Sequence, residues 1–394
     1  MTERFTGSFT QQEPIPEDAV AAALAVLRHG RLHRYNLTPG EVGEAAALEE
    51  DFAAFTGARY CLAVASGGYA LATALRAVGV GPGDAVLTNA FTLAPVPGAI
   101  ASLGATPLFV DTTDALTIDL DDLAAKAGQA RVLLLSHMRG HICDMDALMG
   151  IARVHDMVVI EDCAHTMGAS WAGIPSGRHG VIGCYSTQTY KHMNSGEGGL
   201  IVSDDADLMA RMILMSGSYM LYPHHRAAPP PEAFEARKWT TPNISGRMDN
   251  LRAAILRPQL ARLPGQIARW NTLYRAIEAG LAATPGLSLI PRPQAEAFVG
   301  SSFQVLLPGW SADRITDLVT RCAGRGVELK WFGAAEPVAF TSRHDSWRYA
   351  PAQALPKTDA VLAGLIDLRL PLTFTPRDCA LIARIIDAEV RQGS

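Results

Sequence analysis

Two residues of the chain, Asp162 and Lys191, are of types that could do chemistry together. Asp162 ends the apolar run "VVIED", so its carboxylate is expected at the end of a strand, either as a helix N-cap or paired with a buried cation. Lys191 follows "GCYSTQTY" and precedes the glycines of "SGEGG", which let the backbone pass closely. It is either an ordinary surface lysine or a partly desolvated amine. Desolvation would lower its pKa and make it a nucleophile able to form a Schiff base.

A glycine turn supplies a third chemical element. In "SGGYA", Ser66 to Ala70, the chain leaves an apolar stretch and enters an alanine- and leucine-rich one. The backbone N–H groups of such a turn and the helix N-terminus after it can hold a phosphate, and Ser186 could add a hydroxyl. A Schiff-base lysine, an Asp able to hold a pyridinium nitrogen and a phosphate turn together indicate a pyridoxal phosphate site.

These residues need a scaffold, and the pattern of the first half predicts one. Short apolar runs alternate with helical segments, which predicts a mostly parallel α/β sheet covered by helices on both faces. Ligands of such sheets bind beyond the carboxyl ends of the strands. The expected strands are 60–66, 85–90, 106–111, 131–137 and 157–162, and the expected helices are 17–28, 69–80, 95–104, 119–127 and 145–155.

The second half reads differently. Residues 226–234, with "PPP", predict an exposed, partly stiff loop. A long helical segment over 249–281 is expected to break at Pro258 and Pro264, and mixed strand and helix signals after about Thr284 predict a smaller α+β lobe. We therefore expect a large domain with an N-terminal arm over residues 1–262, and a small domain with a linking helix over residues 263–394.

Composition excludes several classes of function. A formal net charge of −5 without basic runs argues against nucleic-acid binding. No run approaches the roughly 20 apolar residues of a membrane helix, and the polar start is no signal peptide. The six cysteines lack metal-type spacing, so we expect no metal site and reduced cysteines in a cytoplasmic protein. No G-x-G-x-x-G follows the first strand, which argues against a nicotinamide dehydrogenase.

The motifs "VVIEDCAHTMGASWAG", "GCYSTQTYKHMNSGEGGLIVSDD", "GVGPGDAVLTNAFTLAP", "GATPLFVD" and "CDMDAL" resemble those of the DegT/DnrJ/EryC1/StrS aminotransferases, over about residues 17–387. The resemblance implies the α/β fold of fold type I pyridoxal phosphate enzymes and a homodimer with shared active sites. It also implies transfer of an amino group from glutamate or glutamine to a keto sugar, cyclitol or related carbonyl compound in a biosynthetic pathway.

The resemblance also implies roles for residues. Lys191 would bind the cofactor and move protons, Asp162 would face the pyridine nitrogen, and His165 would lie near the ring hydroxyl unless it is a core histidine of a helix. The remaining cofactor contacts would be Gly67, Gly68, Tyr69, Leu93, Ser186 and Ser245. Four of these depart from the family: Gly68 and Tyr69 stand where Thr and Ala are usual, Leu93 where an aromatic ring stacks, and Ser245 where an asparagine reaches the phosphate.

Two arginines are candidates for substrate binding. Arg139, where relatives tend to carry an aromatic residue, could bind a carboxylate or phosphate, or form a structural ion pair. Arg247 is a second candidate, and the loop Tyr219 to Trp239 would cover the site or be solvated. A pyridoxal phosphate lyase or dehydratase and a non-catalytic regulatory relative are the alternatives. Relatives that dehydrate carry His at the lysine position, so Lys191 favours transamination. The acceptor and the choice between glutamate and glutamine stay open.

Overall fold

A seven-stranded sheet forms the centre of the molecule in the computed structural model, which describes residues 3–392. All strands run in one direction except β9, which is antiparallel to both neighbours. The strands are apolar runs that are buried on both faces, as parallel sheets require. Their order is β1 (Tyr60–Val64), β9 (Gly199–Ser203), β8 (Ile182–Ser186), β5 (Val158–Asp162), β4 (Val132–Ser136), β2 (Ala85–Asn89) and β3 (Thr106–Val110).

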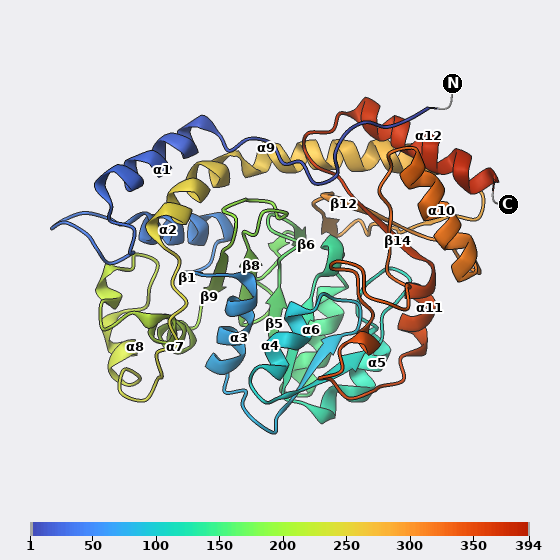
Figure 1. The fold of residues 1–394 in the computed structure, drawn as a ribbon. Helices are drawn as coiled ribbons and strands as arrows, with labels where there is room; N and C mark the ends of the chain where they lie inside the picture. The colour runs from blue at the N-terminus through green and yellow to red at the C-terminus, as the bar shows by residue number, and fades with distance from the viewer. Residues whose placement is uncertain (1–2, 393–394) are drawn as a thin grey trace.

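Helices cover both faces of this sheet, which confirms the predicted α/β architecture (Figure 1). Alternate strand residues point to opposite faces. Leu134 and Ile160 therefore pack with one group of helices, while Leu133 and Val159 pack with the other. The first group is α3 (Gly67–Ala77), α4 (Pro95–Ala101) and α7 (Ala206–Gly217). The second is α2 (Glu44–Thr56), α5 (Leu120–Lys126), α6 (Met145–Val154) and part of α9 (Asn250–Leu281).

A smaller antiparallel sheet lies in the C-terminal part of the chain, where the sequence predicted an α+β lobe. Its order is β10 (Ser288–Leu289), β12 (Ser302–Leu306), β14 (Leu365–Arg369) and β13 (Lys330–Trp331). Helices α10 (Ala312–Gly324) and α12 (Pro376–Gln392) accompany it, and α12 packs along α9 (Figure 1). Short strand β11 (Glu296–Ala297) pairs with β6 (Ser170–Trp171), which pairs with β7 (Ile174–Pro175), so this part is hydrogen-bonded to the large sheet's connections.

Other elements complete the fold. Helix α1 (Glu17–His29) lies along α9, and α11 (Pro356–Gly364) precedes β14 (Figure 1). Single 3-10 turns occupy 127–129, 138–140, 222–224 and 344–346. Within residues 3–392, no helix has both the length and the apolar character needed to cross a membrane.

The predicted break of the long helix is wrong. Helix α9 runs without interruption through Pro258 and Pro264. Each internal proline removes a backbone hydrogen bond, at a cost of about 3 kcal/mol. Burial of apolar side chains such as Leu256, Leu260 and Leu263 against the core offsets this cost. The predicted boundary between residues 262 and 263 falls inside α9, and we retain it as a proposed division with α9 as the connecting element.

The prediction that residues 226–234 form an exposed loop is also wrong in part. Residues Pro231–Glu235 form helix α8, and Phe234 is buried and stacks on Tyr222 with ring centroids 4.0 Å apart. The Ala227 carbonyl accepts a hydrogen bond from the Cys61 N–H, at the edge of β1. Prolines favour an extended or turn backbone, but the apolar residues among them are drawn into the core.

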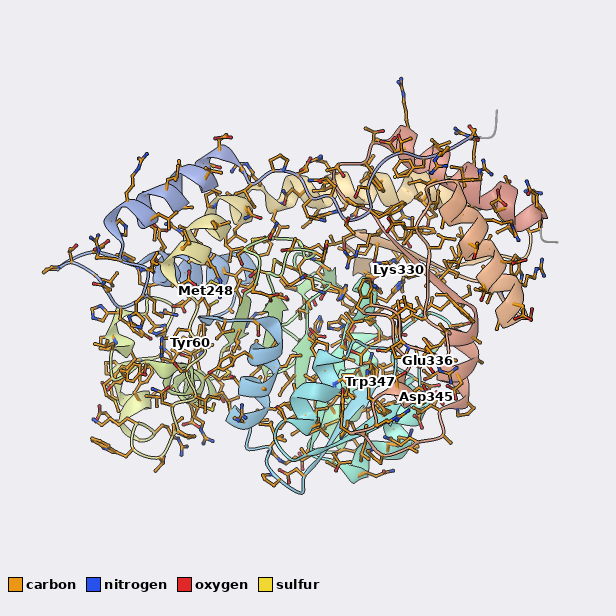
Figure 2. All side chains as sticks on the ribbon, viewed as in Figure 1. Tyr60, Met248, Lys330, Glu336, Asp345 and Trp347 are labelled. Atoms are coloured by element: carbon orange, nitrogen blue, oxygen red, sulfur yellow. The ribbon has the colours of Figure 1, made fainter. Side chains whose placement is uncertain are left out.

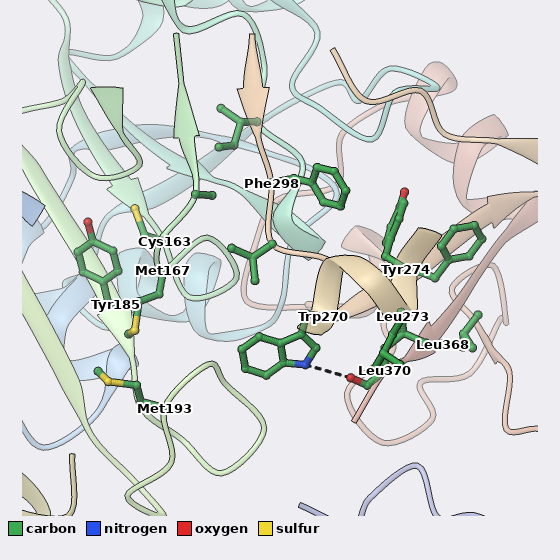
Figure 3. Packing of buried hydrophobic residues seen from close by; sticks show 14 of the residues in the cluster. Cys163, Met167, Tyr185, Met193, Trp270, Leu273, Tyr274, Phe298, Leu368 and Leu370 are labelled. Carbon is green, nitrogen blue, oxygen red and sulfur yellow. Dashed lines mark hydrogen bonds between the residues drawn. The ribbon is translucent and has the colours of Figure 1, made fainter. Parts of the chain in front are cut away.

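The core continues from the central sheet into the smaller lobe (Figure 3). Met167, Tyr185 and Met193 lie on one side of this contact, and Trp270 of α9 lies between them and the second sheet. The Trp270 indole Nε1 donates a 3.0 Å hydrogen bond to the Leu370 carbonyl. The segment that carries Lys191 therefore lies where the two lobes meet.

Candidate active site

Lys191 lies in the connection between β8 and β9, and its amine faces inward. Nζ lies 2.8 Å from Nε2 of His165. Burial and, after it, the positive charge of Arg139 lower the pKa of Lys191 to about 7, although the Asp162 carboxylate acts in the opposite direction. Burial and the charge of Lys191 also hold the pKa of His165 well below its usual value. An uncharged amine, the form that acts as a nucleophile, is therefore accessible near neutral pH.

Asp162 ends β5, as predicted, and is 8% exposed. Its Oδ2 accepts a 3.0 Å hydrogen bond from the Ser136 hydroxyl, and its Oδ1 accepts one of 3.1 Å from the Ala164 N–H. The next element is strand β6, so Asp162 does not cap a helix. Burial raises the pKa of Asp162, while the Ala164 N–H and the charge of Lys191 act in the opposite direction. Such a carboxylate is suited to a cationic partner in the pocket.

One pocket brings most of the predicted cofactor residues together. It lies at the carboxyl ends of β1, β4, β5 and β8, where ligands of open α/β sheets bind. The predicted residues that line it are Gly67, Gly68, Leu93, Asp162, His165, Ser186 and Lys191. Ser136 and Met138 also line it, and the sequence alone did not single them out.

The N-terminus of α3 forms the end of this pocket that suits a phosphate. Ser66 caps the helix, its hydroxyl accepting a 3.1 Å hydrogen bond from the Tyr69 N–H, and the first turn carries no acidic side chain. A Cβ at Gly67 would lie 2.9 Å from the Ser186 Cβ, so only glycine permits this approach of the two segments. Free N–H groups at a helix N-terminus and a nearby hydroxyl are a ready anion site.

The residues present therefore fit pyridoxal phosphate. Lys191 offers an amine for the aldehyde, Asp162 offers a buried carboxylate for the ring nitrogen, and the start of α3 offers donors for the phosphate. His165 lies beside the amine in a turn after β5, so the alternative of a core histidine on a helix face is wrong.

Three predicted residues lie outside the pocket lining. The Tyr69 hydroxyl donates a 3.2 Å hydrogen bond to the Met215 carbonyl, and its ring packs against Gly246. Ser245 is exposed and has a left-handed backbone with φ 51°. Arg247 donates a 2.9 Å hydrogen bond to the Gly217 carbonyl, and its guanidinium lies 5.2 Å from the ring centre of Tyr219. Within one chain, these three residues do not contact the pocket around Lys191.

The loop Tyr219 to Trp239 is anchored by a buried charged network. Nδ1 of His225 lies 3.0 Å from Oε2 of Glu49, and Nε2 lies 2.7 Å from the Tyr35 hydroxyl. Glu49 also accepts two 2.8 Å hydrogen bonds from Arg34 and one of 2.8 Å from the Ala63 N–H. This loop does not line the pockets that reach Lys191, and His225 serves as its anchor to α2 and β1.

Arg139 forms the ion pair that the sequence left as one of two alternatives. Its Nη2 lies 2.9 Å from Oδ2 of Asp367 on β14. The side chain also lines a pocket that adjoins Lys191 and His165, and Arg369 lines the same pocket. Arg369 was missed by sequence reasoning because a lone arginine at a strand end, 178 residues after Lys191, carries no local signal.

The comparisons with known proteins agree with this geometry. The sequence model of the DegT/DnrJ/EryC1/StrS aminotransferase family matches residues 15–387. The chain is 32% identical over 363 residues to the 3-amino-5-hydroxybenzoate synthase of Amycolatopsis mediterranei (strain S699), covering 88% of this chain and 90% of that protein. It spans 58% of the pleiotropic regulatory protein of Geobacillus stearothermophilus, at 35% identity over 58% of this chain. It spans 39% of a putative L-glutamine:3-amino-2,3-dideoxy-scyllo-inosose aminotransferase of Streptoalloteichus tenebrarius, at 42% identity over 40% of this chain.

Solved structures extend the similarity to the whole fold. The crystal structure of 3-amino-5-hydroxybenzoic acid synthase superimposes with a TM-score of 0.84 at 26% identity, covering 100% of both chains. S. venezuelae DesV, solved in complex with a ketimine intermediate, has a TM-score of 0.81 at 28% identity, covering 100% of this chain and 99% of that one. The architecture is that of fold type I. With the motifs at the carboxyl ends of the sheet and a match over residues 15–387, the chain belongs to the DegT/DnrJ/EryC1/StrS aminotransferase family.

Proposed function

We propose that the protein is a pyridoxal phosphate-dependent aminotransferase. It would transfer an amino group from glutamate or glutamine to a keto sugar, cyclitol or related carbonyl compound in a biosynthetic pathway. The observation that carries the proposal is the inward-facing Lys191 amine, 2.8 Å from His165, in the pocket that also holds the Asp162 carboxylate. The names of aligned relatives support the substrate class, since they include inosose and amino-sugar aminotransferases.

Lys191 would have two tasks in this reaction. Its uncharged amine would hold the cofactor through the aldehyde, and, once released, it would carry a proton to and from the substrate carbon. A pKa of about 7 suits both tasks, because an acid–base group works best when its pKa lies near the working pH. His165, at 2.8 Å, would orient the amine and stay uncharged beside it.

Asp162 would hold the cofactor ring. Its two oxygens are kept in place by Ser136 and the Ala164 N–H, so the carboxylate has a fixed direction toward the pocket. Bound pyridoxal phosphate would supply an electron sink, whose strength depends on a protonated ring nitrogen next to such a carboxylate. Leu93 would pack on the ring where an aromatic residue was expected, because it lines the same pocket.

A wide cleft offers a way in for substrates. It reaches Lys191 and His192 from outside, between the N-terminal segment Gln12 to Pro16 and helix α9. Ion pairs join these elements: Glu13 of the N-terminal segment lies 2.6 Å from Arg269 of α9, and Asp18 of α1 lies 2.7 Å from Arg262 of α9.

A homodimer with shared active sites accounts for the three residues outside the pocket. We propose that Ser245 and Arg247 serve the pocket of the second copy, and that Tyr69 positions their segment by packing against Gly246. A cytoplasmic location is part of the same proposal and is supported by the six cysteines, all of which are free and buried.

The alternatives make different predictions for one experiment. The purified protein, loaded with pyridoxal phosphate, is mixed in turn with glutamate, glutamine and alanine while its visible absorption is followed. An aminotransferase loses the visible absorption band of its bound cofactor when its own amino donor is added, and it recovers this band when the matching keto acid is added. A lyase or dehydratase would show a band that no amino donor removes reversibly. The same holds for a regulatory protein, which is what the name of the relative from Geobacillus stearothermophilus says. That result would rule out the proposed reaction.

A further inference from the structure

A second pocket adjoins the cofactor pocket at Lys191 and His165, and two arginines line it. Arg139 lies in the turn Met138–Gly140 after β4, and Arg369 is the last residue of β14. The two elements belong to different sheets, so this pocket exists only because the small lobe packs on the large one. The hydroxyl-bearing residues Ser301 and Ser302 also line it.

Arg139 is a buried cation whose hydrogen-bonding capacity is not used. The residue is 5% exposed. Nη2 lies 2.9 Å from Asp367, but the two groups are not aligned for a hydrogen bond, and within residues 3–392 neither Nε nor Nη2 has a hydrogen-bond partner. Its backbone is left-handed, with φ 56° and ψ 20°, a strained conformation for arginine that is often found at functional sites. Unfilled donors on a buried guanidinium are costly, and a bound anion would fill them.

The Arg369 guanidinium packs against two aromatic rings, and it has no carboxylate of its own among the described residues. The guanidinium lies 3.9 Å from the ring centre of Tyr190 and 4.8 Å from that of Phe340. The carboxylate whose charge acts on it, Asp367, pairs with Arg139, and within residues 3–392 Arg369 forms no ion pair of its own. A guanidinium held against aromatic rings has restricted directions and can still make a two-point contact with a carboxylate.

Positive charge gathers around the Phe340 ring. Arg139 and Arg369 lie 5.1 and 4.8 Å from its centre, and the Lys330 amine lies 3.9 Å from it. Lys330 and the segment after it can be located in Figure 2 by the labels Lys330, Glu336 and Trp347. The facing carboxylates are Asp367, the cross-strand partner of Lys330, and the exposed Glu328. One positive charge of this group therefore has no counterpart.

We propose that Arg139 and Arg369 form a subsite for a carboxylate of the substrate that reacts at Lys191. The inference rests on the proposed function, which places the reacting carbon beside the Lys191 amine. The carboxylate could be that of the amino donor or that of an acidic carbonyl acceptor, and both would meet the same two guanidinium groups. Burial of one arginine and stacking of the other keep the pair rigid, so the site is formed before the substrate arrives.

The test is a binding measurement on the full chain loaded with pyridoxal phosphate, by calorimetry and by displacement of the visible band. Three probes are used: glutarate for the donor's carboxylates, D-glucuronate for an acidic sugar, and D-glucose as its neutral counterpart. Arg369→Gln should weaken binding of a carboxylate probe at least about tenfold, the range for a lost hydrogen bond to a charged group. Arg384→Gln is the matched control, because Arg384 is exposed and pairs with Glu3.

Arg139 is tested with its partner. Arg139→Gln alone would leave Asp367 buried without its cation, so the double variant Arg139→Gln/Asp367→Asn is used. A loss confined to glutarate assigns the subsite to the donor, and a loss confined to glucuronate assigns it to the acceptor. The inference is overturned if the wild type binds neither carboxylate better than glucose, or if Arg369→Gln and the double variant bind both as the wild type does. A protein that acquires no visible band with pyridoxal phosphate fails the proposed function instead.

Discussion

The amine of Lys191 should titrate far below an ordinary lysine in the protein prepared without cofactor. The structure gives it a pKa of about 7 instead of 10.5, which corresponds to a roughly 3000-fold larger acid dissociation constant. At pH 7 about half of the Lys191 amines are then uncharged, against about one in 3000 for an unperturbed lysine. The cause is removal of the amine from water, with a second contribution from the charge of Arg139.

The chain suits a direct measurement because it contains only five lysines. Competitive labelling with trace acetic anhydride at a series of pH values, read by peptide mass spectrometry, follows each amine separately. Lys191 should reach half of its full reactivity near pH 7, and Lys330, with a pKa lowered by burial to about 8, should follow. Lys357 serves as the internal reference, because its hydrogen bond to Asp119 raises its pKa above 10.5.

Substitution of the neighbours separates the causes. Asp162→Asn removes the carboxylate that favours the charged amine, so the midpoint of Lys191 should move below 7. The Arg139→Gln/Asp367→Asn variant removes a positive charge that disfavours the charged amine, so the titration midpoint of Lys191 should move upward. The reasoning is refuted if Lys191 titrates together with Lys357, or if Asp162→Asn moves its midpoint upward.

Three further outcomes follow from the same contacts. Lys191→Ala should give no visible band with pyridoxal phosphate while Lys330→Ala keeps it; a band of unchanged intensity in Lys191→Ala would remove the assignment of the site. Gly67→Ala should weaken cofactor binding, because its Cβ would lie 2.9 Å from the Ser186 Cβ, whereas Gly150→Ala in α6 meets nothing within 4 Å; equal dissociation constants for the two variants would contradict the phosphate cradle. Glu49→Gln should lower the free energy of unfolding in urea by about 3–5 kcal/mol by leaving Arg34 buried without its partner. Glu44→Gln, on a partly exposed pair with Arg257, should lower it by less than about 1 kcal/mol. Burial alone would raise the pKa of Glu49, but the charges of Arg34 and His225 bring it to about 2. The stabilisation by Glu49 is therefore complete above pH 4.5 and is lost as the pH falls toward 2. The difference in the free energy of unfolding between wild type and Glu49→Gln should narrow over that range.

The strands and the residues at their ends were predictable from the sequence. Continuous apolar runs ending in Ser66 and Asp162 could be read as buried parallel strands, and the ends of such strands meet along one edge of the sheet. This is why the sequence alone could assign Asp162, Gly67 and Lys191, far apart in the chain, to one pocket. The failures, at Pro258, Pro264 and residues 226–234, came from local preferences that burial overrode.

Only the tertiary structure decided what surrounds that pocket. The sequence left Arg139 between an ion pair and a substrate contact, and the packing of β14 supplies both Asp367 as its partner and Arg369 as its neighbour. Contacts across such distances leave no periodic signal, because they depend on how two separately formed sheets pack together. The hydrophobic pattern therefore determined where the lysine and the aspartate stand, whereas Arg369, one of the charges that lower the pKa of the lysine, reaches the pocket only because the second lobe packs there.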